Sequence, residues 1–469
     1  MNALDLLMCF VLFTAVTILT LMVNVHVPEP YMDELFHVDQ MRRYCAGNFS
    51  QWNPKITTPP GLYTATYLTL LPLIEVLAAI DPRVINTVCS VEILRLVNAL
   101  FISVLYIIAC QVVRCLPATS VSRFQFRVNF VVVNALLFPV FLFTCLLFYT
   151  DLHSLLSVML LYYVQLNQLH RYAALAAFWS VFMRQTNVVW VAFCAALSAW
   201  QVVLGLMQRQ DDTFEDCHDW QALQRLRGLV VRRPSFLAEA VVAVLSQLWG
   251  YALVLLAFGC FVCWNGGLAL GDKSAHQLVF HLPQFYYWIA VTGCFGMPLL
   301  LSRQVLASSV LFVRRHWWMT LLCAVSMAAC IHLFTYDHPY LLADNRHYTF
   351  YIWRRWFGRH WTLKYVLVPA YMYGLYAIVY SLRAQSELWR LGFIVCTLLV
   401  TVPNRLMEFR YFIVPYLFWR LHNSLLDQSK IKLAFESFVE LTVNMATIYL
   451  FLYKPFEWAH EPGTQRFMW

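Results

Sequence analysis

Hydrophobic runs follow one another along almost the whole chain, separated by short polar stretches. The first run extends from Leu6 to Val23, which is long enough to cross a bilayer as a helix. Further runs lie near residues 94–113, 128–148, 155–170, 172–183, 187–207, 237–263, 285–301, 317–334, 365–382, 391–403, 411–419 and 437–453. A less regular segment at 61–80 would either span the membrane or lie in its interface. The pattern predicts an all-α polytopic membrane protein with about 12 to 14 transmembrane helices.

The amino-acid composition supports a membrane protein and excludes a soluble one. Hydrophobic residues make up 61% of the 469 residues and charged residues only 12%, whereas soluble proteins carry about 25% charged residues. Such a chain could not cover a water-exposed surface with polar groups. The net charge of +8 comes from 33 Lys and Arg spread thinly between apolar runs, so no nucleic-acid partner is expected. Most of the fourteen cysteines lie inside apolar runs, and we expect them to act as small apolar residues.

Two features predict the orientation in the membrane. The segments 114–127, 208–236 and 302–316 each carry several Lys or Arg, as is typical of cytoplasmic loops. Asn48 begins an Asn-Phe-Ser sequon in the loop after the first run, and its use would place that loop in a lumen. The two features agree if the N-terminus is cytoplasmic and segment 61–80 does not span. The first run lacks preceding Lys or Arg and a following cleavage site, so we expect it to be retained as a helix.

Four segments are unusually rich in polar and aromatic residues, and this orientation places all four in the lumen. They cover about 24–60, 264–284, 335–364 and 403–411. We treat residues 1–469 as one integral-membrane domain whose site is built from these segments. A smaller polar break at 184–187 would mark either a tight turn or part of a site, because charge at that depth is costly.

The first of these segments contains two adjacent carboxylates, Asp33 and Glu34. If 31–45 is helical, Asp33 and His37 share a face, while Asp33 and Glu34 point about 100° apart. Only one of the two can therefore be central to a given site. A carboxylate beside the membrane suits general-base work on a sugar hydroxyl. A helix N-terminus that simply uses these residues as a cap is the structural alternative.

Cations in the other three segments could bind a phosphate. Arg346 follows Asp344 and precedes His347, and its planar fork suits an anionic oxygen pair. Arg410 and Lys273 are further candidates, although snorkelling and polar loop packing would explain them too. Residues 353–356 fit an aromatic and cationic belt at the headgroup level. No cluster with metal-ligand spacing and no nucleotide-binding loop is visible, so neither a metal nor another cofactor is expected.

Several long strings in the sequence resemble one known family, the dolichyl-phosphate-glucose-dependent α-1,2-glucosyltransferases of the endoplasmic reticulum. The strings begin with PYMDELFHV at Pro30 and NFSQWNPKITTPPGLY at Asn48. Further ones are FMRQTNVVW, LGDKSAH, HPYLLADNRHYTFYIWRR, EFRYFIVPY and the terminal QRFMW. They are ordered and spread from residue 30 to residue 469, so the resemblance covers essentially the whole chain.

The resemblance implies a GT-C fold, a multi-pass protein of the endoplasmic reticulum membrane with a luminal active site. Its donor would be dolichyl phosphate glucose, and its acceptor the di-glucosylated lipid-linked oligosaccharide on dolichyl pyrophosphate. An acidic residue in the first luminal loop would be the base of an inverting reaction, which here points to Asp33, with Glu34 orienting the acceptor. The substrate-binding candidates, named above from their luminal placement and charge, are His37, Lys273, Asp344, Arg346, His347 and Arg410.

Two other functions remain as alternatives. Another GT-C transferase, such as a dolichyl-phosphate-mannose user, would share the chemistry, but the strings LADNRHY and QRFMW argue against it. A transporter or channel accessory protein would place buried charge near the bilayer midplane and often carries inverted repeats. The sequence has no such repeat, and its polar residues gather in loops.

Overall fold

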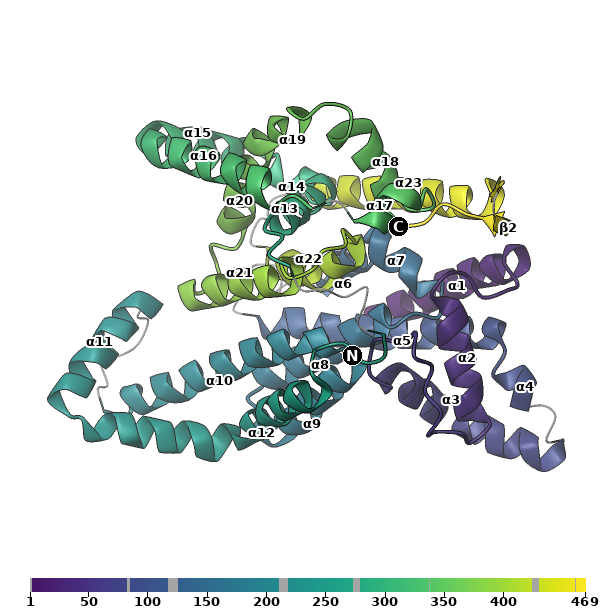
Figure 1. Cartoon of the computed structure of the whole chain (residues 1–469). Helices are drawn as coiled ribbons and strands as arrows, with labels where there is room; N and C mark the ends of the chain where they lie inside the picture. Colours follow the sequence, from purple (N-terminus) through teal and green to yellow (C-terminus); the bar gives the residue numbers. More distant parts are fainter. Residues whose placement is uncertain are drawn as a thin grey trace.

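The computed structural model describes residues 2–81, 85–116, 125–210, 218–272, 279–336, 338–423, 430–459 and 461–469, and helices dominate it (Figure 1). The first half contains α1 (Ala3–His26), α2 (Glu34–Cys45), α3 (Gly61–Ile80), α4 (Ile85–Val88), α5 (Val91–Cys115), α6 (Gln125–Leu136), α7 (Pro139–Cys145), α8 (Asp151–Leu166), α9 (His170–Met183), η3 (Gln185–Asn187), α10 (Val188–Gln208) and α11 (Asp219–Arg232). The second half contains α12 (Ser235–Asn265), α13 (Pro283–Phe295), α14 (Met297–Leu300), α15 (Arg303–Arg315), α16 (Trp317–Phe334), α17 (Pro339–Ala343), α18 (Tyr348–Ile352), η4 (Trp353–Phe357), α19 (Leu363–Val366), α20 (Val368–Ser381), α21 (Glu387–Thr401), η5 (Phe409–Phe412), α22 (Ile413–His422) and α23 (Lys430–Tyr453). The prediction of an all-α polytopic membrane protein is confirmed.

Seven of the described helical segments are long and apolar enough to cross a membrane. They are Ala3–His26, Val91–Cys115, Gln185–Gln208, Ser235–Asn265, Trp317–Phe334, Leu363–Ser381 and Lys430–Tyr453. Large apolar side chains stay exposed along them, among them Phe10 of α1 and Leu322 of α16, as expected of surfaces that face lipid. The total of 12 to 14 spans stays a prediction, because many of the other helices are shorter.

One expected run is divided into two helices. The apolar stretch at 128–148 forms α6 and α7, whose axes are bent by 73°. The break precedes Pro139, the first residue of α7, because the residue before a proline is disfavoured in helical conformation. After this bend the chain turns back toward the polar segments, and residues 146–150 lie beside the candidate site.

The helices pack as two groups that meet through α21 and α22 (Figure 1). In the first group α1 packs on α5, α5 on α8 and α8 on α9, while α12 covers α9 and α10. In the second group α13, α15 and α16 surround α20. Helix α21 contacts both α10 and α13, and α22 contacts both α6 and α8. The first, second and fourth polar segments meet through backbone hydrogen bonds, in which residues 270 and 272 donate to residues 57 and 54, and residues 279 and 281 donate to residues 403 and 402.

Two ion pairs, one of them fully buried, tie neighbouring helices together. Arg420 of α22 and Glu436 of α23 are both fully buried and joined by contacts of 2.6 and 2.5 Å, and Asn134 of α6 donates to the same carboxylate. Near the start of α1, Asp5 accepts from Arg114 near the end of α5 at 2.6 Å. A charge removed from water is stable only when it is paired in this way. These pairs therefore fix which helices are neighbours.

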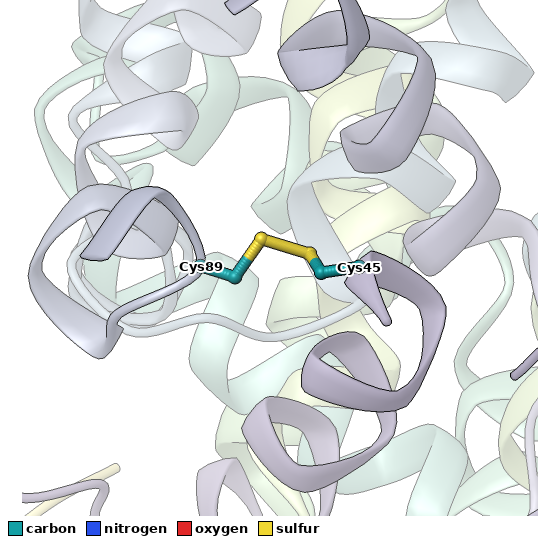
Figure 2. Close-up of a disulfide and its surroundings, with 2 residues drawn as sticks. All are labelled: Cys45 and Cys89. Atoms are coloured by element: carbon teal, nitrogen blue, oxygen red, sulfur yellow. A yellow bond between two sulfur atoms is a disulfide. The ribbon is translucent and has the colours of Figure 1, made fainter. Parts of the chain in front are cut away.

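A disulfide and a short β-hairpin were not expected from the sequence. Cys45 at the end of α2 forms a disulfide with Cys89, just before α5 (Figure 2). This corrects the expectation that the cysteines act only as apolar residues. A short antiparallel hairpin follows α23 and pairs β1 (Phe456–Trp458) with β2 (Glu461–Gln465). Strand β2 begins the C-terminal tail, residues 461–469.

The disulfide generates a prediction about stability. It closes a loop of 44 residues that contains α3 and the end of the first polar segment, residues 45–60. Cys89→Ser should lower the free energy of unfolding by about 2–4 kcal/mol, since the open chain gains loop entropy. The matched control is Cys260→Ser, which changes an exposed free cysteine. Thermal unfolding in detergent is the measurement, and equal unfolding temperatures for the two variants would contradict the prediction.

Candidate active site

The adjacent carboxylates at the start of α2 face different surroundings. Met32 has a φ of 57°, in the left-handed region that non-glycine residues rarely adopt, and it turns the chain immediately before Asp33. The side chain of Glu34 is fully buried, whereas that of Asp33 is 50% exposed. This turn therefore explains why only one of the two carboxylates can be central to a site.

Glu34 is held on all sides by hydrogen bonds. Arg95 of α5 donates to its two oxygens at 2.9 and 2.6 Å. The backbone N–H groups of Phe148 and Tyr31 donate to the same carboxylate at 2.7 and 3.0 Å. No part of Glu34 is exposed to an acceptor, so its expected role of orienting the acceptor does not fit its position.

Arg95 also holds the connection between α1 and α2. Its other N–H groups donate to the carbonyl oxygens of Val27 and Glu29 at 2.6 and 3.1 Å, and to Asn24 at 3.2 Å. Sequence reasoning did not single out Arg95, although an arginine inside an apolar run is itself a signal. The pair of Arg95 and Glu34 fixes the turn that presents Asp33.

Asp33 occupies the N-cap position of α2, but its side chain makes no capping hydrogen bond. It lies instead 3.3 Å from the guanidinium of Arg410 in η5, measured from Oδ2 to Nη2. The geometry therefore favours a site residue over the structural alternative of a helix cap. Half of the Asp33 side chain remains exposed beside this contact.

Arg410 is the centre of a cluster of carboxylates. Besides Asp33, its guanidinium lies 3.0 Å from Glu408 and 3.9 Å from Asp151. It also lies over the ring of Tyr149, with its central carbon 5.4 Å from the ring centre. Arginine is well suited to this position, because its planar fork contacts several oxygens at once and always carries a charge.

Asp151 is a buried member of the site that sequence reasoning missed. It begins α8, and its Oδ1 accepts from Arg184 at 2.7 Å. Its Oδ2 is buried and has no hydrogen-bond partner, lying 3.9 Å from Arg410. The only sequence signal is a carboxylate between two apolar runs.

The polar break at 184–187 forms a tight turn at the edge of the same cluster. Arg184 follows the end of α9, and η3 continues into α10. Gln185 donates to the carbonyl oxygen of Thr57 at 2.6 Å, which anchors the first polar segment beside it. The break is therefore both a turn and a contributor to the cluster.

His37 lies one helical turn after Asp33, as expected. Its Nδ1 is 2.7 Å from the hydroxyl of Tyr63 in α3. Burial lowers the pKa of His37 to about 4, so the imidazole is neutral near pH 7. It would therefore contact a substrate as a hydrogen-bonding group and not as a cation, and that contact stays a prediction.

Asp344, Arg346 and His347 hold the C-terminal tail. Arg346 binds both oxygens of Asp344 at 2.8 Å and donates to Gln465 of the tail at 3.1 Å. His347 Nδ1 lies 3.1 Å from the carbonyl oxygen of Trp469. These expected substrate-binding residues thus have partners within the protein.

The tail in turn supports the turn before Asp33. Arg466 donates from its side chain to the carbonyl oxygen of His26 at the end of α1 and to two carbonyl oxygens at the end of α23. Its backbone N–H donates to the hydroxyl of Tyr31 at 2.8 Å. Trp469 packs against Phe409, the neighbour of Arg410. The string QRFMW therefore contacts both the chain just before Asp33 and the residue just before Arg410.

Lys273 lies outside the described residues. Its neighbour Asp272 is 3.8 Å from Lys55, and the backbone N–H of Asp272 donates to Pro54. Among the residues that the structure describes, no three His, Cys, Asp or Glu side chains are grouped as metal ligands.

The different surroundings of the two carboxylates predict different effects on stability. Glu34→Gln should lower the free energy of unfolding by about 3–5 kcal/mol, because it leaves the buried charge of Arg95 unpaired. Asp33→Asn should change it by about 1 kcal/mol or less, since this carboxylate is half exposed. Thermal unfolding of the two purified variants is the measurement. Equal losses, or a larger loss for Asp33→Asn, would contradict the assignment.

Comparison with known proteins shows the family of the chain. A sequence model of the DIE2/ALG10 family matches residues 27–421. Proteins named Dol-P-Glc:Glc(2)Man(9)GlcNAc(2)-PP-Dol alpha-1,2-glucosyltransferase are similar over nearly their full lengths. That of Mus musculus is 38% identical over 453 residues, covering 94% of this chain and 93% of its own, and that of Homo sapiens is 37% identical over 457 residues with the same shares. That of Arabidopsis thaliana is 32% identical over 498 residues, covering 96% and 97%. No solved structure matches. The chain belongs to the DIE2/ALG10 family.

Proposed function

We propose that this protein transfers glucose from dolichyl phosphate glucose to the di-glucosylated lipid-linked oligosaccharide, forming the terminal α-1,2 linkage. The names of relatives that match over nearly their full lengths support the donor, the acceptor and the linkage. The single observation that carries the chemistry is the half-exposed Asp33 beside a fully buried Glu34. A dolichyl-phosphate-mannose-dependent transferase of the same fold would share this chemistry, but no described contact favours it.

Asp33 is the general base of the proposed reaction. Its free oxygen takes the proton from the acceptor 2-hydroxyl as that oxygen attacks C1 of the donor glucose. The bond between C1 and the phosphate oxygen breaks, and dolichyl phosphate leaves with the bonding electrons from the opposite face. One base is sufficient for this single displacement, which inverts a β-linked donor to an α-linked product.

Arg410 orients the base in this proposal. Its guanidinium contacts Asp33 while Glu408 and Asp151 hold it from other sides. A fixed cation stabilises the ionised form of a neighbouring carboxylate. Since Arg410 already fills the position between these carboxylates, we propose that the reaction needs no metal ion or other cofactor.

We also propose that the site faces the lumen of the endoplasmic reticulum. The disulfide between Cys45 and Cys89 lies at the far end of α2 from Asp33, and such bonds persist in oxidising compartments. Asn48 of the sequon is exposed in the same segment and is therefore accessible to glycosylation. Both features support the orientation that the loop cations predict.

The function is tested by complementing microsomes that lack the native enzyme. Given dolichyl phosphate glucose and the di-glucosylated acceptor, the wild-type chain should add one glucose. Asp33→Asn should reduce that turnover by roughly 10²- to 10⁴-fold while the protein remains folded, because the proton acceptor is lost. Asp39→Asn is the matched control, as this carboxylate pairs with Arg43 on α2. Full turnover by Asp33→Asn would exclude it as the base, and a wild-type chain that uses only a mannose donor would overturn the proposed function.

A further inference from the structure

A pocket of about 490 Å³ lies in the third polar segment and is lined mainly by arginine. Its walls are Phe350 and Tyr351 of α18, Arg354 and Arg355 of η4, and Arg359 just beyond. We call this the arginine pocket. It is separate from the cluster around Asp33, since it shares no lining residue with it.

The arginines of the pocket differ from the two that the sequence singled out for phosphate. Arg346 and Arg410 are each paired with carboxylates. In the described part of the chain, no carboxylate lies within ion-pair distance of Arg354, Arg355 or Arg359. An anion would therefore meet no competing negative partner in the pocket.

Two of these side chains make cation–π contacts with the aromatic walls. The guanidinium carbon of Arg354 lies 5.7 Å from the ring centre of Phe350, and that of Arg355 lies 5.5 Å from that of Tyr351. Contacts with a ring use the face of the guanidinium and leave its N–H groups free at the edge. The N–H groups of both side chains are therefore available to a ligand.

The arginines of the pocket lie on and just after an irregular helical turn. Residues Trp353–Phe357 form a π-helical turn, in which the N–H of Gly358 donates to the carbonyl oxygen of Trp353 at 2.8 Å. Such turns interrupt regular helices and occur frequently at functional sites. Trp356 and Trp361 next to the pocket are exposed, as expected for residues at the level of lipid headgroups.

The C-terminal tail connects the arginine pocket to the cluster around Asp33. Phe467 contacts Tyr351 of the pocket, with ring centres 6.0 Å apart. Two residues later, Trp469 contacts Phe409, with ring centres 5.8 Å apart. Phe409 directly precedes Arg410. The pocket and the base therefore flank the same short piece of chain.

We propose that the arginine pocket binds the phosphate of a polyprenyl-linked substrate. The inference rests on the proposed function for the identity of that substrate. Its chemistry is common to the donor monophosphate and the acceptor diphosphate, and arginine is the side chain best suited to either. The lipid chain would leave the pocket along the exposed tryptophans.

The test measures binding of two sugar-free probes, dolichyl phosphate and dolichyl diphosphate, to the purified full chain. The triple variant Arg354→Gln, Arg355→Gln, Arg359→Gln should weaken one probe by roughly tenfold or more, since charge-assisted hydrogen bonds are lost. Loss of the monophosphate assigns the pocket to the donor, and loss of the diphosphate assigns it to the acceptor. The control is Arg383→Gln, an exposed arginine stacked on Tyr380 in a different loop, which should change neither affinity.

Two results would overturn the proposal. One is unchanged affinity for both probes in the triple variant. The other is an equal loss of binding to phosphatidylglycerol vesicles, which would make the pocket a general membrane contact. If the triple variant does not fold, the single variants Arg355→Gln and Arg359→Gln are measured in the same way. A wild-type chain that binds the probes but transfers no glucose would contradict the proposed function and leave the pocket standing.

Discussion

The buried ion pair of Glu34 with Arg95 is the interaction on which the site depends. Arg95 crosses from α5 to the connection between α1 and α2, where it binds Glu34 and two backbone carbonyl oxygens. Without a carboxylate opposite it, a buried guanidinium would be strongly unfavourable. Because Glu34 satisfies Arg95, the turn at Met32 is fixed and the neighbouring Asp33 is left exposed. Two chemically similar residues thereby acquire separate functions, one structural and one available for chemistry.

A second layer of contacts positions Asp33 from the opposite side. Arg410 lies between carboxylates that come from distant parts of the chain, and the C-terminal tail packs beside it through Trp469. The tail is itself fixed by Arg346 and by Arg466, whose backbone N–H meets Tyr31 two residues before Asp33. The last residues of the chain therefore support the first polar segment. This explains physically why site-bearing strings are spread over most of the sequence.

The pattern of hydrophobic runs was sufficient to predict the all-α membrane class and the first helix, and the spacing of Asp33 and His37 predicted their shared face on the condition that 31–45 is helical. It could not decide between Asp33 and Glu34, because the choice depends on Arg95, which is distant in sequence. Asp151 was missed for the same reason, since its partners Arg184 and Arg410 meet it only in the fold. The disulfide was also missed, because spacing alone does not show which cysteines approach each other. Arg346, by contrast, was expected from the sequence to bind a phosphate, and the structure pairs it with Asp344.

Chemical rescue tests most directly that Asp33, and not Glu34, supplies the base. Removing the side chain in Asp33→Gly leaves a position open to solvent, where a small carboxylate such as formate can replace it, whereas the place of Glu34 is sealed by packing. Glucose transfer is measured for Asp33→Gly and Glu34→Gly over a range of formate concentrations. We expect formate to restore turnover in Asp33→Gly with saturation and to have no effect on Glu34→Gly. An equal response of the two variants, or full wild-type turnover by Asp33→Gly without formate, would contradict the assignment.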